Sequence, residues 1–395
     1  MKKLLFVIDS LNSGGAEKSL TSLLNLLDYS RYQVDVMLMS REGLFLPLLP
    51  KKVNLLDPPV CMTNRKNGPM YLLKNFLFRE LFAYLALSIS IRLPIYAKKY
   101  HGAQLSWKWL GKIMNKHEKS YDVAIAYSQG MPTYFVADKV SAKLKLSWVN
   151  IDYKEAGYNK HFDKPFYEKF NKTITVSHLN HNIFTEVFPE FKNQTAIIYD
   201  IISSEFVNQL ACSEGGFTDS YDGIKLLSIG RLTPQKGYDL AIEACRKLKS
   251  DGIPFKWYII GEGELREQIL EQIEQYGLQE HLILLGTFSN PYPFIKQCDI
   301  YVQPSKFEGY GLAIAEARIL RKPIVTTNFS VVHNQIVHES NGLIVNMNAE
   351  DLYKGIRRMI VDEMLRKRVV TQLMTEQVGT EKEIYKFYSL VETAN

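Results

Sequence analysis

The feature that most constrains the fold of this chain is a regular alternation of short apolar runs with helical patterns. Residues 4–8 form the first apolar run, a loop reading DSLNSGG follows, and apolar side chains then recur at helical spacing from about Ala16. A second apolar run at 34–39 makes the opening unit β-α-β. Because alternating strands and helices favour a parallel sheet covered on both faces, we expect an α/β fold.

The same alternation runs through the chain in two blocks. In the first block we predict further strands at 123–126, 146–149, 173–176 and 196–199. In the second block we predict strands at 224–229, 255–260, 282–285, 300–303 and 324–326, separated by helices at 238–250, 265–276, 292–297 and 312–320. Between the blocks, 201–223 is rich in Ser, Gly and Asp and has no periodicity. The sequence therefore predicts an N-terminal domain over 1–205, a linker over 206–222 and a C-terminal domain over 223–377.

Length and composition exclude several classes of protein. The chain has 395 residues, of which 46% are hydrophobic and 23% charged, as in a globular protein of two or three domains rather than a disordered or collagen-like one. Its four cysteines form no C-x-x-C pair, so we expect neither a disulfide framework nor a zinc module. The run at 4–8 is shorter than a signal-peptide core, and the uncharged run at 81–91 is shorter than a membrane span. We therefore expect a cytoplasmic protein.

The positive charge is concentrated in one segment. The whole chain carries a formal net charge of +6, whereas residues 51–120 contain 13 Lys or Arg and three acidic residues, an excess of ten, so the remainder is net negative. Because aromatic residues lie among these basic ones, the segment is suited to an anionic membrane surface, and we expect that partner rather than nucleic acid. The alternative is a pair of amphipathic helices that pack on the N-terminal sheet and leave their lysines solvated.

A cation pair follows the first strand of the second block. The segment SIGRLTPQKGYDL, residues 228–240, places Gly230, Arg231 and Lys236 between a strand end and a helix N-terminus. Two cations beside a glycine at such a turn are a suitable arrangement for holding a phosphate group. The alternative is a solvated loop that carries two surface charges.

Two carboxylates flank a glycine-containing turn in the segment PSKFEGYGLAIAEA, residues 304–317. Glu308 precedes the turn, and Glu316 lies just over one turn inside the following helix. Free backbone N–H groups at Gly311 and Leu312 suit an anion, and the carboxylates can accept hydrogen bonds from sugar or ribose hydroxyls. A glycosidase with paired carboxylates is disfavoured, because one acid lies beyond the anion site. The alternative is a helix cap with a surface glutamate.

The other motifs are weaker. The segment IIGEGELRE, residues 259–267, lacks the third glycine of the dinucleotide-binding fingerprint, since Arg266 occupies that position. The segment NSGGAEKS, residues 12–19, offers a second candidate anion site at a helix N-terminus. His178 and His181 have no third ligand nearby and the chain has no D-x-D pair, so we expect no metal site and no metal-dependent phosphate chemistry.

Taken together, the motifs SIGRLTPQKG, IIGEGELRE, NPYPFIKQCDIYVQPSKFEGYGLAIAEA and NSGGAE, in their places along the chain, resemble the retaining nucleotide-sugar glycosyltransferases of family 4. The sequence of the third motif looks most like the corresponding motif in bacterial enzymes of capsular or exopolysaccharide biosynthesis. The resemblance covers the C-terminal half closely and the N-terminal half only at its first loop and a few strand ends. It implies the GT-B fold, in which two Rossmann-like, doubly wound domains face each other across a cleft, with a last helix, about 378–395, packed back on the N-terminal domain.

The resemblance implies roles for the motif residues. Arg231 and Lys236 would neutralise the donor diphosphate as the glycosidic bond breaks. Glu316 would hold the ribose hydroxyls, and Glu308 would contact the donor sugar. The other donor-binding residues that it implies are Gly15, Gly230, Gly261, Gly263, Phe288, Gly309, Tyr310, Gly311 and Leu312.

Two positions depart from the family pattern. Asn150 stands where many members carry a His, so the task of bonding a sugar hydroxyl or assisting the acceptor passes to Asn150 or Asp152. Asparagine cannot act as a base at neutral pH, and Asp152 is therefore the better candidate for proton transfer. Asp200 replaces a more usual Asn.

The resemblance therefore implies a retaining, metal-independent hexosyltransferase. It would use a nucleotide-diphosphate sugar, with a UDP-sugar favoured and no other cofactor, and extend a lipid-diphosphate-linked saccharide in surface polysaccharide biosynthesis. Such an enzyme would be cytoplasmic and peripheral on the inner face of the bacterial plasma membrane. Two alternatives stay open: a nucleotide-sugar epimerase of the same scaffold, which would consume donor without an acceptor, and a non-catalytic sugar-nucleotide-binding subunit.

Overall fold

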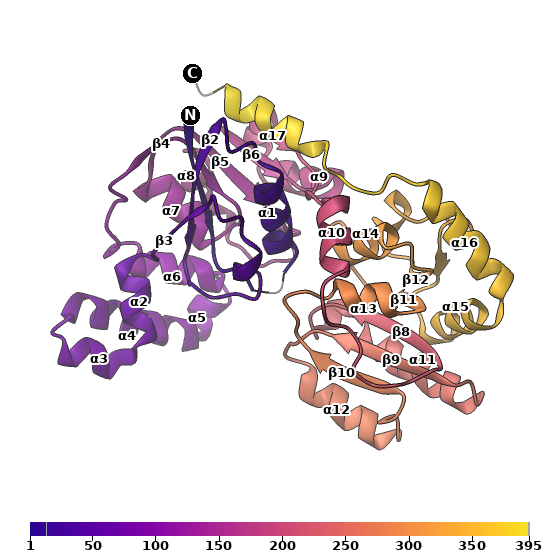
Figure 1. Cartoon of the computed structure of the whole chain (residues 1–395). Coiled ribbons are helices and arrows are strands. Elements are labelled where there is room, and N and C mark those ends of the chain that lie inside the picture. Colours follow the sequence, from indigo (N-terminus) through magenta and orange to yellow (C-terminus); the bar gives the residue numbers. More distant parts are fainter. Residues whose placement is uncertain (13, 394–395) are drawn as a thin grey trace. The chain divides into compact units, whose positions relative to one another are not determined.

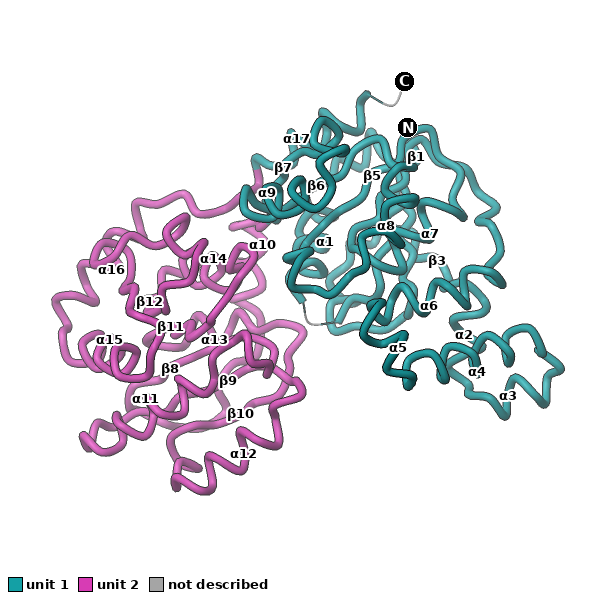
Figure 2. The backbone as a smooth tube through the Cα atoms, turned by 180° about the vertical axis from the view of Figure 1, so that it is seen from behind, with its two compact units in different colours: residues 1–201, 382–395 teal, residues 202–381 magenta. Residues whose placement is uncertain are grey.

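The chain folds into two compact units. A computed structural model describes residues 1–12 and 14–393. The first unit comprises residues 1–201 and the last segment of the chain from 382, and the second unit comprises 202–381 (Figure 2). Each unit contains one parallel sheet and its own hydrophobic core. The alternation of strands and helices thus produces the α/β fold that the sequence predicts.

The first unit is built on a seven-stranded parallel sheet in the order β3-β2-β1-β4-β5-β6-β7 (Figure 1). Its strands are β1 (Lys2–Ile8), β2 (Tyr32–Leu38), β3 (Asn54–Leu56), β4 (Ser120–Ala126), β5 (Ser141–Val149), β6 (Lys172–Thr175) and β7 (Thr195–Ile197). Alternate residues of β1 belong to different cores, since Leu4, Phe6 and Ile8 pack on one face and Leu5 and Val7 on the other. Burial on both faces explains the unbroken apolar run.

Helices cover both faces of this sheet. α1 (Gly15–Leu26) and α17 (Glu383–Glu392) line one core, and α7 (Met131–Lys139) lines the other. The remaining helices are α2 (Val60–Lys66), α3 (Gly68–Lys74), α4 (Phe78–Arg92), α5 (Pro94–Ala97), α6 (Gly102–Leu110), α8 (Lys160–Tyr167) and α9 (His178–Val187), with 3₁₀ turns at Leu46–Leu48 and Pro189–Gln194. The basic segment 51–120 thus lies between β2 and β4 and is mostly helical.

The second unit is built on a six-stranded parallel sheet in the order β10-β9-β8-β11-β12-β13. Its strands are β8 (Ile224–Ile229), β9 (Phe255–Ile260), β10 (Leu282–Gly286), β11 (Ile300–Gln303), β12 (Ile324–Thr327) and β13 (Leu343–Val345). Its helices are α10 (Ser204–Ala211), α11 (Tyr238–Ser250), α12 (Arg266–Gln275), α13 (Tyr292–Gln297), α14 (Leu312–Ile319), α15 (Ala349–Val361) and α16 (Glu363–Thr375), with 3₁₀ turns η3 (Pro234–Lys236) and η4 (Val332–Asn334). Strands β8, β9 and β11 and helices α11 and α13 have the predicted bounds.

The unit boundaries differ from the predicted domain boundaries. The predicted linker at 206–222 begins inside α10, because Ser203 caps that helix by accepting the backbone N–H of Phe206 at 3.1 Å. The second unit extends to residue 381 rather than 377. The last helix, α17, places Ile384 and Phe387 in the core of the first unit.

None of the helices among the described residues is both long and apolar enough to cross a membrane. The uncharged run at 81–91 lies in α4, which has 15 residues. A membrane-spanning helix needs about 20.

Candidate active site

In each sheet the strand order reverses at one place, and the loops at that place carry most of the predicted site. In the second unit the reversal lies between β8 and β11, which pair side by side. Ligands of parallel α/β sheets bind at the carboxyl ends of the strands that flank such a reversal. The loop 230–237 leaves β8 there, and the loop 304–311 leaves β11.

Lys236 and Glu308 form an almost buried ion pair between these two loops. The Lys236 ammonium donates to both carboxylate oxygens of Glu308, at 2.7 and 2.9 Å. The two side chains are only 15% and 11% exposed. The loops are also joined by Gln235, whose carbonyl accepts the N–H of Lys306 at 2.8 Å and whose amide donates to the Phe307 carbonyl at 2.9 Å. The charge of Lys236 is therefore balanced inside the site.

Three polar side chains that sequence reasoning missed complete the surroundings of Glu308. Ser305 and Gln303 donate to Glu308 Oε1 at 2.7 and 3.0 Å. Tyr301 donates to the Gln303 amide oxygen at 2.6 Å. All three side chains are buried, and a buried carboxylate needs such donors. The signal that could have found them is the polar Gln303 at the end of an otherwise apolar strand.

Three glycines, of which Gly261 and Gly263 are predicted site residues, let backbone segments approach each other closely. Gly237 has a φ of 68°, in the left-handed region, and a Cβ there would collide with the Pro304 carbonyl. A Cβ at Gly261 would collide with the Gly230 carbonyl, and one at Gly263 would meet the same loop. The turns that follow β8, β9 and β11 are therefore held against one another, which gives Gly261 and Gly263 a packing role.

Arg231 lies at the same strand end but outside the Glu308 network. Its side chain is exposed, and the described part of the chain supplies it with no hydrogen-bond or ion-pair partner. The neighbouring Gly230 carbonyl accepts a hydrogen bond from the buried Tyr238 hydroxyl at 2.9 Å, which holds the turn in place. Of the two predicted cations, Arg231 is thus the one whose charge is uncompensated.

The turn from Gly309 to Leu312 leads into α14. Gly311 has a φ of 87° and occupies the N-cap position of that helix. The Gln335 amide donates to the carbonyls of Tyr310 and Gly311, at 2.6 and 3.3 Å. The turn predicted to bind an anion is therefore fixed by a side chain from another loop. No motif marks Gln335, so sequence reasoning had no signal for it.

Glu316 lies inside α14 and is only 2% exposed. The Tyr292 hydroxyl, at the start of α13, donates to Glu316 Oε1 at 2.9 Å. Burial and the adjacent carboxylate raise the pKa of Tyr292 well above its ordinary value, so the phenol stays protonated as the donor. A ribose hydroxyl at Glu316 would join a carboxylate that already accepts the Tyr292 hydroxyl.

Phe288 offers a partly exposed aromatic ring near the Gly261 turn. Its side chain is 37% exposed, and its ring centroid lies 4.5 Å from that of Phe294. The N–H of Gly261 donates to the Gly286 carbonyl at 2.7 Å, so the segment that carries Phe288 adjoins this turn. These two predicted donor-binding elements therefore adjoin each other.

The predicted residues Gly15, Asn150 and Asp152 belong to the first unit. They follow β1 and β5, at the carboxyl edge of the sheet where the strand order reverses. Ser128, just after β4, donates to Asp9, just after β1, at 3.2 Å. Polar residues thus gather where β1, β4 and β5 end, and sequence reasoning missed Asp9 and Ser128 among them.

The N-terminus of α1, predicted as an anion site, has a carboxylate of its own. Glu17 lies in the first turn of the helix, and a Cβ at Gly14 would collide with the Glu17 carboxylate. A negative group at this end stabilises a helix through its dipole. An external anion near Gly15 would therefore compete with Glu17.

Asn150 presents an unused acceptor at this edge. Its amide nitrogen donates to the Tyr127 carbonyl at 2.8 Å, and its backbone N–H donates to Gln129 at 3.2 Å. Its amide oxygen is buried and has no hydrogen-bond partner within the described residues. Buried polar atoms are normally satisfied, so this oxygen is a candidate acceptor for a ligand hydroxyl.

Asp152 begins a loop that is anchored by a buried carboxylate. One Asp152 oxygen accepts the backbone N–H groups two and three residues further on, at 2.8 and 3.1 Å. The next side chain, Tyr153, donates to Asp163, which also accepts from Tyr134 at 2.6 Å and from Gln104 at 2.7 Å. Burial raises the pKa of Asp163. The loop is therefore held by hydrogen bonds to Asp163, which also accepts from α6 and α7.

Asp200 is buried beside the first helix. The Ser19 hydroxyl of α1 accepts the N–H of Ile201 at 3.2 Å and lies 3.0 Å from the Tyr127 hydroxyl. Burial raises the pKa of Asp200 to about 7, while a hydrogen bond with Ser19 acts in the opposite direction. This acid therefore titrates near neutral pH.

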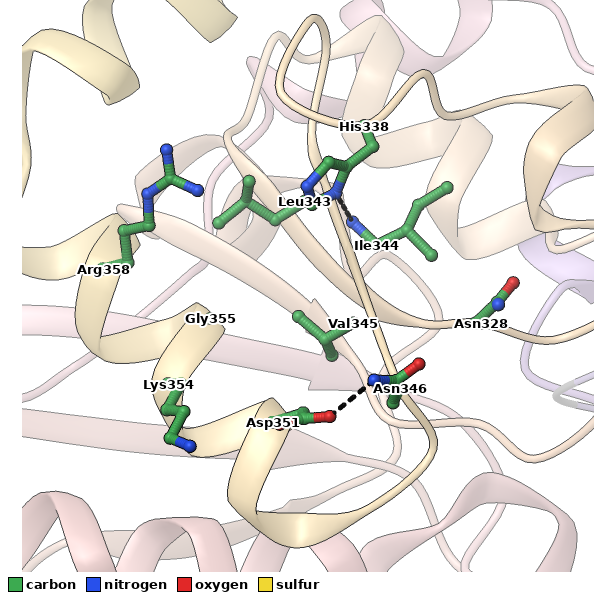
Figure 3. A pocket seen from close by; sticks show the side chains of 10 residues that line it. All are labelled: Asn328, His338, Leu343, Ile344, Val345, Asn346, Asp351, Lys354, Gly355 and Arg358. Carbon is green, nitrogen blue, oxygen red and sulfur yellow. Dashed lines mark hydrogen bonds between the residues drawn. The ribbon is translucent and has the colours of Figure 1, made fainter.

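The described residues contain no group of three or more His, Cys, Asp or Glu side chains placed to hold a metal ion. An open hollow of about 320 Å³ lies over β13 and α15, and no predicted site residue lines it (Figure 3). Polar groups around it are paired with each other, since His338 accepts the N–H of Ile344 at 3.1 Å and Asn346 donates to Asp351 at 2.7 Å. The hollow is separate from the predicted site.

Known proteins share this sequence pattern. The profile of the family described as "Glycosyl transferases group 1" matches residues 219–372, most of the second unit. The "N-acetylgalactosamine-N,N'-diacetylbacillosaminyl-diphospho-undecaprenol 4-alpha-N-acetylgalactosaminyltransferase" of Campylobacter jejuni is 24% identical over 388 residues, which are 97% of this chain and 96% of that protein. The amylovoran biosynthesis glycosyltransferase AmsK of Erwinia amylovora is 35% identical over 129 residues, 30% of this chain and 31% of that protein.

Solved structures share the fold. HepE of Anabaena, in complex with UDP and glucose, matches with a TM-score of 0.67 at 16% identity over 100% of both chains. TarM of S. aureus matches with a TM-score of 0.67 at 16% identity over 99% of this chain and 100% of that chain. The fold is thus GT-B, with two Rossmann-like domains. The second unit therefore carries the sequence pattern of the group 1 glycosyltransferases, and the whole chain is similar to glycosyltransferases in sequence and in fold.

Proposed function

We propose that this chain is a retaining, metal-independent hexosyltransferase that moves a sugar from a nucleotide-diphosphate sugar to a lipid-diphosphate-linked saccharide in surface polysaccharide biosynthesis. The observation that carries the proposal is the pair of cations, Arg231 and Lys236, in the loop that leaves β8 where the strand order of the second sheet reverses. Two cations beside a helix N-terminus suit a diphosphate. The UDP bound by HepE supports a UDP-sugar as the donor.

In the proposed reaction, the bond between the sugar C1 and the β-phosphate oxygen breaks, and the acceptor hydroxyl attacks C1 from the same face. The β-phosphate gains negative charge as the bond breaks, and Arg231 neutralises it. Lys236 takes part by exchanging one Glu308 oxygen for a phosphate oxygen. This exchange frees the Glu308 oxygen to accept a hydroxyl of the sugar.

The first unit would serve the acceptor. The proton of the acceptor hydroxyl moves to the leaving phosphate, and Asp152 is the protein group best suited to assist, because Asn150 cannot act as a base. The unpartnered amide oxygen of Asn150 would accept a sugar hydroxyl. No protein nucleophile is required in this route.

The proposed acceptor is carried by a lipid. The Campylobacter jejuni relative is named for action on a diphospho-undecaprenol-linked sugar, and its match covers 97% of this chain. The basic segment 51–120 would contact an anionic membrane surface that displays such a lipid. The chain would then be peripheral on the inner face of the bacterial plasma membrane.

Transfer can be tested with the purified chain, a panel of nucleotide-sugars and lipid-diphosphate-linked saccharides. Mass spectrometry should detect an acceptor one sugar heavier, and NMR should find the anomeric configuration of the donor retained. An inverted product would contradict retention. Activity lost in EDTA and restored by Mg²⁺ would contradict metal independence, and conversion of the donor without acceptor would favour an epimerase.

A further inference from the structure

Exposed apolar side chains are concentrated on one small projection of the first unit. Among the described residues, twelve of the twenty large hydrophobic side chains that are exposed lie between Val60 and Ile95. They are Val60, Met70, Tyr71, Leu73, Phe76, Phe78, Phe82, Leu85, Ile89, Ile91, Leu93 and Ile95. Helices α3 and α4 stand out from the body of their unit in both views (Figures 1 and 2). Exposed apolar side chains concentrated in this way mark an interaction site.

One face of α4 packs on its own unit. Ala83 and Leu87 are buried in a small cluster with residues of α6, among them Leu105. Ser90 follows on the same face, and its hydroxyl accepts the indole N–H of Trp109 at 3.0 Å. This face holds α4 against α6.

The opposite face of α4 is apolar as well, and it is exposed. Phe78, Phe82, Leu85 and Ile89 recur at helical spacing and are 57%, 67%, 47% and 57% exposed. No charged residue occurs from 81 to 91. A helix that is hydrophobic on all sides is normally covered on all sides. Here Phe82 touches only the edge of its unit, with its ring centroid 6.0 Å from that of Trp109, and the stripe stays largely exposed.

Phe76, between α3 and α4, is exposed in a conformation that favours glycine. Its φ is 55°, and the N–H groups of Phe76 and Leu77 close the end of α3 by donating to the carbonyls of Leu73 and Leu72, at 3.1 and 2.9 Å. Glycine or asparagine usually occupies this left-handed position. The aromatic side chain is 77% exposed, so it contributes little to the fold that would offset the strained backbone.

Basic residues surround this apolar surface. Lys74, Arg79, Arg92 and Lys98 lie at the ends of α3, α4 and α5, and all are exposed. Of the 13 Lys and Arg in 51–120, only Lys66 and Lys119 form ion pairs within the part of the chain that the structure describes. A second copy of the chain would bring two such positive segments together. Anionic lipid headgroups would compensate the charge, which favours a bilayer as the occupant.

We propose that α3–α5 insert the side chains of Phe76 and of the α4 stripe into the apolar boundary of an anionic bilayer. Charge brings the segment to the membrane, and apolar burial then holds it there. The inference rests on the membrane attachment in the proposed function and does not depend on the chemistry of transfer. Because charge is screened by salt and apolar burial is not, attachment should partly resist salt.

Flotation with vesicles tests the insertion. Vesicles of phosphatidylcholine with about one third phosphatidylglycerol are mixed with the full chain at low and at high salt. The low salt gives a Debye length of about 10 Å and the high salt one of about 3 Å. We expect wild type to float at low salt and in part at high salt. Phe82→Gln with Ile89→Gln should weaken binding about tenfold or more at both salts. The matched control is Val361→Gln with Met364→Gln, which removes apolar side chains that are 57% and 76% exposed on the second unit.

A glycine substitution separates binding from folding. Phe76→Gly should keep or raise the thermal stability, because it relieves the left-handed backbone, and should weaken vesicle binding. Arg321→Gly is the matched control, since Arg321 has a φ of 57° just after α14, on the second unit. It should keep or raise stability and leave vesicle binding unchanged.

Insertion depth gives a third readout. In Phe76→Trp, lipids brominated in their acyl chains should quench the fluorescence of the added tryptophan, whereas they should not quench that of Met364→Trp. The proposal is overturned if the Phe82 and Ile89 double variant binds vesicles like wild type, or if the Phe76→Trp signal is unquenched. It is also overturned if light scattering finds a wild-type dimer that this double variant converts to monomer. Vesicle binding without any transfer activity would leave the insertion standing and count against the proposed function.

Discussion

At the residue scale, the two cations of the site are in different electrostatic situations. Arg231 is exposed and carries an uncompensated charge, whereas Lys236 is almost buried and bonded to both oxygens of Glu308. Removing an exposed side chain leaves the fold intact, but removing one partner of a buried ion pair leaves the other charge unpaired. The two positions therefore separate effects on turnover from effects on stability.

Arg231→Ala should lower kcat by about 10²–10³, as expected for the loss of one group that stabilises a developing negative charge. The melting temperature should stay unchanged, because the side chain has no partner to lose within the described residues. Steady-state kinetics and thermal unfolding measure the two effects. Arg246→Ala, an exposed arginine on α11 paired with Glu243, is the control and should leave kcat unchanged. A change of less than a few-fold for Arg231→Ala removes it from the mechanism.

Lys236→Ala should lower both kcat and stability. The unpaired Glu308 carboxylate would remain almost buried, which costs about 3–5 kcal/mol of the free energy of unfolding. Adding Glu308→Gln should restore much of the stability without restoring activity. Urea unfolding of the two single variants and the double variant gives the coupling free energy. Additive effects on stability would contradict the pairing.

At the element scale, α6 connects the projecting helix α4 with the loop that carries Asp152. α4 packs on α6, and Gln104 of α6 donates to Asp163 and to the Asn159 carbonyl, at 2.7 and 2.9 Å. The His101 ring at the start of α6 stacks on Tyr158, with centroids 4.0 Å apart. The loop that carries Asp152 is therefore fastened to the same helix that supports the exposed projection.

The last helix, α17, is a part of the first unit's core although it follows the second unit in sequence. The Phe387 ring is fully buried and lies 5.9 Å from the Phe6 ring of β1, centroid to centroid. Phe387→Ala should cost about 3–5 kcal/mol of the free energy of unfolding of this unit. Hydrogen exchange should then rise in β1 and α17 and stay unchanged in β8. Tyr385→Ala removes a side chain that is 69% exposed on the same helix, and it should change neither the free energy of unfolding nor the hydrogen exchange.

At the scale of the whole molecule, Asp200 should make the stability of the protein depend on pH. Burial raises its pKa from 3.8 to about 7, so the folded state binds this proton more tightly than the unfolded state. Proton binding by Asp200 therefore stabilises the folded state fully below about pH 4, and this stabilisation is lost as the pH rises to about 7. In Asp200→Asn the side chain cannot titrate, so this pH-dependent loss is absent. The free energy of unfolding of Asp200→Asn relative to wild type should therefore rise by about 2–3 kcal/mol between pH 5 and pH 8.

Urea unfolding at the two pH values measures this difference. Glu118→Gln, which changes an exposed acid of the same unit, should follow wild type at both. An Asp200→Asn advantage that stays constant with pH would mean that Asp200 does not titrate in this range.

Most of the second unit could be predicted from sequence, and less of the first. β8, β9 and β11 are buried on both faces and bounded by Gly or Pro, so their apolar runs stand out locally. The short strands β3 and β13 were missed because three residues carry almost no periodicity. The helices α2–α5 were not resolved within the basic segment, because α4 is apolar on two faces and shows no single stripe.

The sequence alone determined the alternation of strands and helices, and with it the fold class and the positions of the motifs at strand ends. It did so because periodicity and turn chemistry act between residues that are near in the chain. Only the tertiary structure decided which charges are compensated, since Lys236 and Glu308 meet across 72 positions of sequence. It also decided which apolar face of α4 is covered, because burial depends on what α6 brings against the helix.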